Sequence, residues 1–287
     1  MPRIWKHLKS VARTALGTRP AGRSLSVFPD DLFIVSYPRS GNTWTRFLIG
    51  NLIYRNDPVT FANVESRVPE IYFYPDRVLR GFKHPRILKS HEYFDPRYKQ
   101  VIYIVRDPRD VAVSMYYYSI KRKNIHDGYA MEEFVPRFMA GEFLEDWGSW
   151  DEHVSSWRAT REGKSGFLLL RYEDMLADPV SELTKVAMFI NLDISGGTVE
   201  RAVKLSSAEH MQELEKTQSS AWTLTKNTRT DIAFVRKARA GTWESELSPV
   251  CVAKIEAAWG PLMRTLGYRL ATADGEKTEL ALPGTGT

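Results

Sequence analysis

Four short segments rich in strand-forming residues lie along the chain, at residues 32–35, 86–89, 101–105 and 167–170. Their apolar positions run continuously instead of alternating with polar ones, which is typical of strands buried on both faces of a parallel sheet. Longer segments repeat apolar residues at helical spacing, near residues 43–54, 111–119, 131–139, 147–161, 179–189, 198–205 and 249–266. The chain has no internal repeat and no linker. The pattern therefore predicts a single α/β domain over residues 25–270, with a central parallel sheet flanked by helices.

The two ends of the chain have a different pattern. Residues 3–16 place apolar side chains at helical spacing among four basic residues, and Gly17 is a suitable C-cap. A short basic amphipathic helix is therefore predicted within residues 1–24. It either makes reversible contact with an anionic membrane surface or packs its apolar stripe on the domain. Residues 271–287 are rich in glycine, threonine and charge, which predicts a disordered tail.

The composition argues against several classes of protein and indicates the cellular compartment. Of the 287 residues, 43% are hydrophobic, yet no apolar run approaches the roughly 20 residues that span a bilayer. Basic residues interrupt the apolar ones at the N-terminus, unlike a secretory signal. The single cysteine, Cys251, excludes a disulfide within the chain and a cysteine-based zinc site. These features predict a cytoplasmic protein, with peripheral membrane contact through residues 3–16 as the open alternative.

The formal net charge of +5 does not indicate a nucleic-acid partner. Six of the 40 lysines and arginines lie in residues 1–24, where no acidic residue occurs, so the rest of the chain is almost neutral. Nucleic-acid binding is therefore not expected.

Residues 33–44 form a strand, a turn of small residues and the start of a helix, which together predict an anion-binding site. Such a turn points several backbone N–H groups at one position, where a phosphate fits. Gly41 permits close approach of the backbone, and Arg39 adds a cation. Ser40 and Thr43 offer hydroxyl groups. Taken alone, the motif is also consistent with a purely structural turn, because such turns commonly use glycine and serine as caps.

This turn lacks the G-x-x-x-x-G-K-[ST] pattern of nucleoside-triphosphate loops. Residues 163–165 contain the tripeptide Gly-Lys-Ser, but Arg158 stands at the position of the first glycine. The tripeptide also precedes a predicted strand instead of following one. A nucleotide-dependent kinase is therefore a weaker alternative.

Residues 101–114 offer a second phosphate contact. A strand delivers Arg106 at its end, and the helix that follows places Ser114 one to two turns in, so both side chains reach the same region. From the residues alone, the alternative is that Asp107 and Asp110 cap the helix while Arg106 forms a surface ion pair.

Three motifs together resemble those of the sulfotransferases that use 3′-phosphoadenosine 5′-phosphosulfate (PAPS). They are Tyr-Pro-Arg-Ser-Gly-Asn-Thr-Trp at residues 37–44, the segment at residues 106–114, and Arg-Lys-Ala-Arg-Ala-Gly-Thr-Trp at residues 236–243. The resemblance extends from about Asp31 to Tyr268. It implies that the first motif cradles the 5′-phosphosulfate, the second binds the 3′-phosphate, and the third closes over the 3′-phosphate and adenine. The nucleotide-binding residues that it implies are Arg39, Ser40, Gly41, Asn42, Thr43, Trp44, Arg106, Ser114, Tyr172, Arg236, Lys237 and Ala238.

The resemblance also implies the catalytic residues. Residues 86–91 are similar to the family strand that ends in L-K-[TS]-H, so His91 would deprotonate the acceptor hydroxyl at a near-neutral pKa while Lys89 contacts the phosphosulfate. Negative charge grows on the bridging oxygen of the leaving nucleotide, and Lys89 and Arg39 would stabilise it. No metal is required, because side chains meet the charges of the nucleotide. The other five histidines match no motif.

Two positions depart from the family pattern, since Arg39 replaces the usual lysine and Ala238 replaces the first glycine of the R-K-G motif. A nucleotide-binding or membrane-associated protein that kept the fold without catalysis is therefore a second alternative. Residues 71–74, 116–118 and 120–150 are expected to line the acceptor pocket. Their aromatic residues suit a phenol, lipid or steroid-like group, while the basic residues at 121–123 suit a carboxylate or sugar sulfate. The choice between a small molecule, a lipid, a glycan and a peptide tyrosine stays open.

Overall fold

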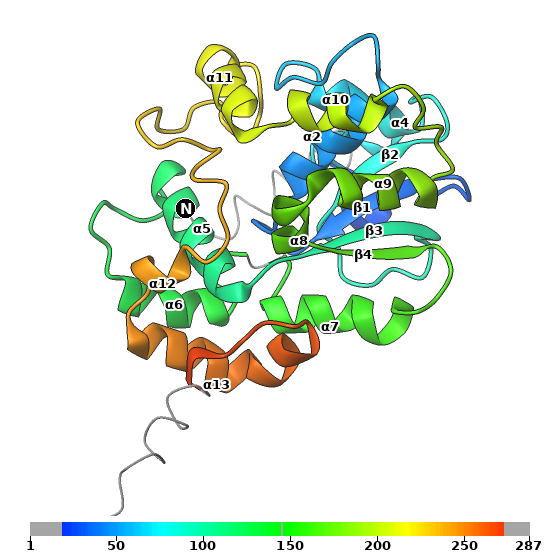
Figure 1. The fold of residues 1–287 in the computed structure, drawn as a ribbon. Helices are drawn as coiled ribbons and strands as arrows, with labels where there is room; N and C mark the ends of the chain where they lie inside the picture. The colour runs from blue at the N-terminus through cyan, green and yellow to red at the C-terminus, as the bar shows by residue number, and fades with distance from the viewer. Residues whose placement is uncertain (1–18, 145, 273–287) are drawn as a thin grey trace, which may run out of the picture.

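A sheet of four parallel strands lies at the centre of the computed structural model, which describes residues 19–144 and 146–272 (Figure 1). The strands are β1 (Leu32–Ser36), β2 (Ile87–Ser90), β3 (Gln100–Val105) and β4 (Phe167–Arg171), in the spatial order β2-β1-β3-β4. In this register Val35 of β1 lies opposite Ser90 of β2 and Tyr103 of β3. The predicted parallel sheet is confirmed. Because all strands run in one direction, their carboxyl ends meet at one edge.

Twelve α-helices of the described residues surround the sheet. They are α2 (Asn42–Ile53), α3 (Val64–Arg67), α4 (Asp76–Leu79), α5 (Pro108–Lys121), α6 (Met131–Met139), α7 (Trp150–Arg161), α8 (Tyr172–Ala177), α9 (Pro179–Phe189), α10 (Thr198–Leu205), α11 (Ala208–Gln218), α12 (Trp243–Glu246) and α13 (Pro249–Thr265). A 3-10 turn, η1 (Gly22–Ser24), precedes β1. The seven helices predicted for residues 43–266 are confirmed as α2, α5, α6, α7, α9, α10 and α13. The sequence pattern did not predict α8, α11 or the four-residue helices.

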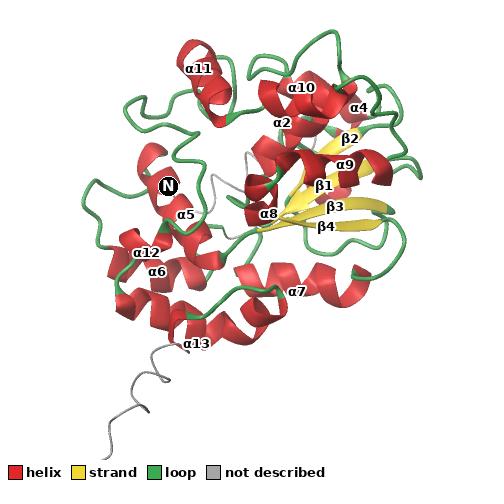
Figure 2. Ribbon diagram, viewed as in Figure 1, coloured by secondary structure: helices red, strands yellow, loops and turns green. Residues whose placement is uncertain are grey.

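The helices cover both faces of the sheet (Figure 2). Successive side chains of β1 point to opposite faces, so Phe33 packs in a core with Trp157 of α7 and Ile255 of α13, while Ile34 packs in a second core with residues of α2, α9 and α10. All five residues of β1 are buried as a result. Burial on both faces is the reason that the strand sequences are continuously apolar.

Two predicted features fall largely outside the described residues. The predicted helix at residues 3–16 lies outside them, and so do residues 273–287 of the predicted tail. Within the described ranges, no helix is both long enough and apolar enough to cross a membrane.

Candidate active site

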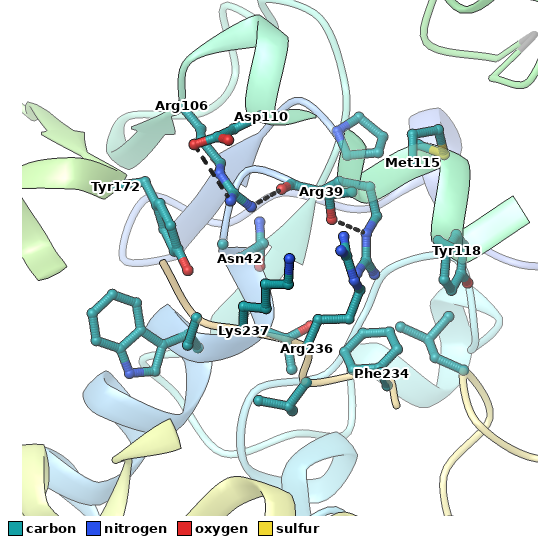
Figure 3. Close-up of a pocket in the computed structure, with 18 of the residues that line it drawn as sticks. Arg39, Asn42, Arg106, Asp110, Met115, Tyr118, Tyr172, Phe234, Arg236 and Lys237 are labelled. Carbon is teal, nitrogen blue, oxygen red and sulfur yellow. Dashed lines mark hydrogen bonds and ion pairs between the residues drawn. The ribbon is translucent and has the colours of Figure 1, made fainter. Parts of the chain in front are cut away.

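A cavity opens at the carboxyl ends of the strands, where the segments after β1, β2 and β3 meet a loop from the C-terminal part of the chain. Figure 3 shows the side chains of Arg39, Arg106, Arg236 and Lys237 around one central space. Among the described lining residues, the cations are Arg39, Lys89, Arg106, Arg236, Lys237 and Arg239, and the carboxylates are Glu70 and Asp110. The excess of cations makes this cavity suitable for a ligand with several negative charges.

The turn between β1 and α2 is built for close approach to a ligand. Gly41 has a φ of 100°, and a Cβ atom at this position would lie 2.5 Å from Cδ2 of Tyr172. No side chain caps the first turn of α2, so its N–H groups are available to an anion. Asn42 donates to the Ile34 carbonyl and the Ser36 hydroxyl, while its buried Oδ1 atom has no partner among the described residues.

Ser40 is the one predicted site residue that does not line the cavity. Its side chain is fully buried, and its hydroxyl has no hydrogen-bond partner in the described part of the chain. The other eleven predicted nucleotide-binding residues all line the cavity, together with Lys89 and His91. A serine in a turn can face either side, and the sequence motif does not specify which.

Arg39 is held by contacts from helix α5 and from the loop that contains Phe234. Its Nε atom donates to the Ser114 hydroxyl at 3.1 Å, and its guanidinium carbon lies 4.5 Å from the Tyr118 ring centroid and 4.8 Å from that of Phe234. Burial, with help from the charges of Arg106 and Arg236, lowers the pKa of Arg39 to about 10. Arg39 therefore remains a cation at neutral pH. Its neighbours Arg106 and Arg236 are also positive, so the charge of Arg39 is not neutralised within the site, and an anionic ligand would neutralise it.

Arg106 marks a second position for an anion. Its guanidinium carbon lies 4.3 Å from the Tyr172 ring centroid, and it donates to the carbonyl oxygens of Arg39 and Arg239 at 3.3 and 3.2 Å. Its buried Nε atom has no partner among the described residues. The Trp44 ring lies at the side of Tyr172, with 5.7 Å between the centroids. The two aromatic rings border the cavity where a planar base would fit.

The loop at residues 236–243 is fastened to helix α5 by Asp110. This buried carboxylate accepts hydrogen bonds from the backbone N–H groups of Gly241 and Trp243, at 2.8 and 3.0 Å, and from the Thr242 hydroxyl at 2.8 Å. The alternative that Asp107 and Asp110 both cap helix α5 therefore holds for Asp107 alone, because Asp110 binds the loop instead. The second and third sequence motifs are thus physically joined. Ala238 adopts a φ of 45°, which is unfavourable for a residue with a Cβ atom.

The ring of His91 has a defined tautomer. Its Nδ1 atom lies 2.6 Å from the carbonyl oxygen of Ser36, which can only accept, so Nδ1 carries the proton and Nε2 of the neutral ring has a free lone pair. Burial, followed by the charge of Lys89, lowers the pKa of His91 well below its ordinary value. The near-neutral pKa expected from the sequence is therefore wrong, because burial removes the water that would stabilise the imidazolium. At neutral pH His91 is in the form that accepts a proton.

A buried histidine supports the backbone of His91. Nε2 of His153 lies 3.0 Å from the His91 carbonyl oxygen, and its Nδ1 lies 2.9 Å from the Tyr103 hydroxyl. Nε2 must be the donor, so Nδ1 accepts from Tyr103. This chain of hydrogen bonds joins β3 and α7 to the segment after β2, and no motif around His153 predicted it.

Part of the cavity has apolar walls, which reach His91 at Trp147, with 5.3 Å between the two ring centroids. The described residues that form them are Met115, Tyr118, Leu144, Trp147, Met211, Leu224 and Phe234. Of the segments expected to line an acceptor pocket, residues 71–74 do not contribute, whereas Tyr118, Leu144 and Trp147 do. Lys121 is also unavailable, since its buried ammonium group pairs with Glu215 and donates to the carbonyl oxygens of Arg229 and Ile232.

Comparison with known proteins agrees with this geometry. The family model described as "Sulfotransferase domain" matches residues 29–267. Sulfotransferase 1A1 of Bos taurus is 34% identical over 239 residues, which cover 77% of this chain and 79% of that protein. The 3-beta-hydroxysteroid sulfotransferase of Cavia porcellus is 31% identical over 228 residues, which cover 75% and 77%.

Solved structures show the same fold. Retinol dehydratase in complex with androsterone and inactive cofactor PAP matches with a TM-score of 0.72 and 20% identity, over 88% of this chain and 86% of that one. A mouse sulfotransferase complexed with PAP matches with a TM-score of 0.68 and 23% identity, over 85% and 87%.

The Arg106 Nε donor, which has no partner among the described residues, the cationic walls and the uncapped N–H groups of α2 fit a nucleotide with two phosphate-bearing ends. The kinase and non-catalytic alternatives are therefore set aside. The chain belongs to the sulfotransferase family and is an enzyme that transfers a sulfuryl group from PAPS.

Proposed function

We propose that this enzyme sulfates the hydroxyl group of a small apolar acceptor and that His91 is the general base. The observation that carries this proposal is the position of His91, which uses Nδ1 on the Ser36 carbonyl, leaves the Nε2 lone pair for an acceptor, and lines the same cavity as the cationic turn with its ring 5.3 Å from that of Trp147. An acceptor in the apolar part would present its hydroxyl to His91 on the side that faces the nucleotide.

PAPS supplies an activated sulfuryl group and a leaving nucleotide. In the proposed reaction, His91 takes the proton of the acceptor hydroxyl at Nε2 while the acceptor oxygen bonds to sulfur and the bond from sulfur to the phosphate oxygen breaks. The electron pair of that bond stays on the nucleotide. Arg39, Lys89 and the first N–H groups of α2 stabilise this developing negative charge. The Ser36 carbonyl, which accepts from Nδ1, stabilises the protonated ring until the proton is released.

The apolar walls support the acceptor class. Two of the proteins similar to this chain carry the names of steroid sulfotransferases, and a structure of the same fold contains androsterone. A glycan would leave its many hydroxyl groups without partners against Met115, Leu144 and Trp147. A small alcohol or phenol buries its apolar part there and exposes one hydroxyl group to His91.

The test is transfer of labelled sulfate from PAPS to a panel of steroids, phenols, simple alcohols and glycans. His91→Gln should lower kcat by about 10²- to 10⁴-fold, because general base catalysis is lost. The matched control is His126→Gln, since His126 is exposed and lies outside the cavity, and it should retain wild-type activity. Binding of adenosine 3′,5′-bisphosphate to His91→Gln shows that the site is intact. If this variant binds the nucleotide and still transfers sulfate at the wild-type rate, His91 is not the base.

A further inference from the structure

A carboxylate lies in the cavity wall directly beside Lys89. Oε2 of Glu70 accepts from Nζ of Lys89 at 2.7 Å, and the two side chains are only 6% and 4% exposed. Both residues line the cavity. The backbone also fixes the pair, because the Lys89 N–H donates to the Pro69 carbonyl at 2.9 Å and the Ile71 N–H donates to the Lys89 carbonyl at 3.2 Å. Glu70 is thus bound on both sides to the strand that carries Lys89 and leads to His91.

The neighbouring Glu65 differs from Glu70, because its carboxylate links several segments of the fold. Glu65 accepts from Arg46, from the Trp222 indole and from the backbone N–H of Glu70, so it joins several segments. Glu70, by contrast, has Lys89 as the one side-chain partner of its carboxylate in the described part of the chain. The backbone hydrogen bonds of its neighbours already place Glu70 beside Lys89, and Glu70 is the one hydrogen-bond partner of the Lys89 ammonium group in the described part of the chain.

We propose that Glu70 is a positioning residue, which holds the Lys89 ammonium group in its protonated form at the cavity wall, ready for the phosphosulfate. The inference rests on the proposed function of Lys89 in stabilising the leaving group. An ammonium group has three donors, so Lys89 can keep its bond to Glu70 while it donates to the nucleotide. Glu70 thereby fixes the direction of Lys89 before the nucleotide arrives.

The charges around Lys89 show why it needs this partner. Burial lowers the pKa of Lys89 and the nearby Arg46 acts in the same direction, whereas the charge and hydrogen bond of Glu70 and the charge of Glu65 raise it. Two further titratable groups lie near this pair and are uncharged at pH 7, since the pKa of His91 is lowered by burial and by Lys89, and that of Tyr118 is raised by burial. Without the charge of Glu70, the balance shifts towards the uncharged amine. An uncharged amine no longer neutralises the charge on the leaving oxygen.

The test compares Glu70→Gln, which keeps the shape but removes the charge, with Glu70→Asp, which keeps the charge on a shorter side chain. The matched control is Glu182→Gln, because Glu182 pairs with Lys185 on α9, away from the cavity. The titration of Lys89 is followed in nucleotide-free protein through its ¹³C-labelled Cε resonance, assigned with Lys89→Gln. Sulfate transfer from PAPS and binding of adenosine 3′,5′-bisphosphate are measured on the same proteins.

In Glu70→Gln, Lys89 should lose its proton at a lower pH than in the wild type, and the alkaline limb of kcat should move to lower pH with it. At pH 8 kcat should fall by at least roughly 10-fold. This loss should be smaller than the roughly 10²- to 10³-fold loss of kcat that follows when an electrostatic donor is removed altogether. Binding of the bisphosphate, which has no sulfuryl group, should change less than twofold. Glu70→Asp should lie between wild type and Glu70→Gln, and Glu182→Gln should match wild type.

An unchanged Lys89 titration in Glu70→Gln overturns the inference, as does an unchanged kcat in an active enzyme. Equal losses in Glu70→Gln and Glu70→Asp would also overturn it, since they would mean that side-chain length, not charge, matters. A wild-type protein that transfers no sulfate to any acceptor would contradict the proposed function instead, and the Lys89 titration would still decide whether Glu70 holds the ammonium group protonated.

Discussion

The substitution Gly41→Ala tests whether the phosphate turn depends on the close contact between its backbone and Tyr172. Two separate costs follow from the structure. At a φ of 100°, a residue with a Cβ atom is disfavoured by about 1–2 kcal/mol. The new Cβ would also lie 2.5 Å from Cδ2 and 2.9 Å from Cε2 of Tyr172, and such overpacking costs about 1–3 kcal/mol. The free energy of unfolding should therefore fall by about 2–5 kcal/mol, a large part of the stability of a typical domain.

Gly163→Ala separates the two costs. Gly163 also has a positive φ, of 75°, but nothing lies within 4 Å of an added Cβ. Its substitution should cost only the backbone term, so the difference between the two variants in urea unfolding measures the contact with Tyr172.

Displacement of Tyr172 also disturbs the ring that lies against Arg106. Gly41→Ala should therefore weaken adenosine 3′,5′-bisphosphate binding in calorimetry, whereas Gly163→Ala should not. If Gly41→Ala is no more destabilising than Gly163→Ala, the close-contact reasoning is refuted.

Three further predictions concern the loop and the buried histidine. Ala238→Gly removes the strain of a φ of 45° but raises the conformational entropy of the unfolded chain. The first effect is the larger, so the free energy of unfolding should rise by about 0.5–1 kcal/mol in urea titrations. A decrease would show that the loop is unstrained. Asp110→Asn removes the charged acceptor of the loop, and calorimetry should show bisphosphate binding weakened by about 10- to 100-fold, while unchanged binding would mean that the loop closes without it. Burial lowers the pKa of His153 from 6.5 to about 4, so its neutral form stabilises the fold above pH 6.5 and this contribution is lost as the pH falls towards 4. Between pH 7.5 and pH 5, wild type should lose about 2 kcal/mol more stability in urea than His153→Gln, and parallel losses would contradict this assignment.

The sheet could be predicted from sequence because burial on both faces leaves a local signal. The strand at 101–105 is continuously apolar, and its residues are buried. Helix α11 left a weaker signal, since it buries few of its side chains, among them Met211. Its apolar contact is made largely with residues distant in sequence, such as Phe47 and Phe61. A short window of sequence does not contain that information.

The residues of the site that belong to sequence motifs could be predicted, whereas those outside the motifs could not. Arg39, Arg106 and His91 belong to motifs whose order resembles the family, and the structure brings them to one cavity. Glu70 carries no motif, because its significance comes from a contact with Lys89, 19 residues away. The pKa of His91 was likewise beyond sequence reasoning, since it depends on burial by parts of the chain that fold around it.

The attachment of residues 241–243 to Asp110 has a consequence for the order in which the enzyme matures. All four strands and the phosphate turn are complete in the sequence at Arg171, whereas the loop that carries Arg236 and Lys237 is synthesised later. During translation, Asp110 is therefore made well before the backbone groups that it binds. We therefore expect full affinity for the sulfuryl donor only when most of the chain has left the ribosome, and a chain truncated before Arg236 should bind PAPS more weakly than the finished enzyme.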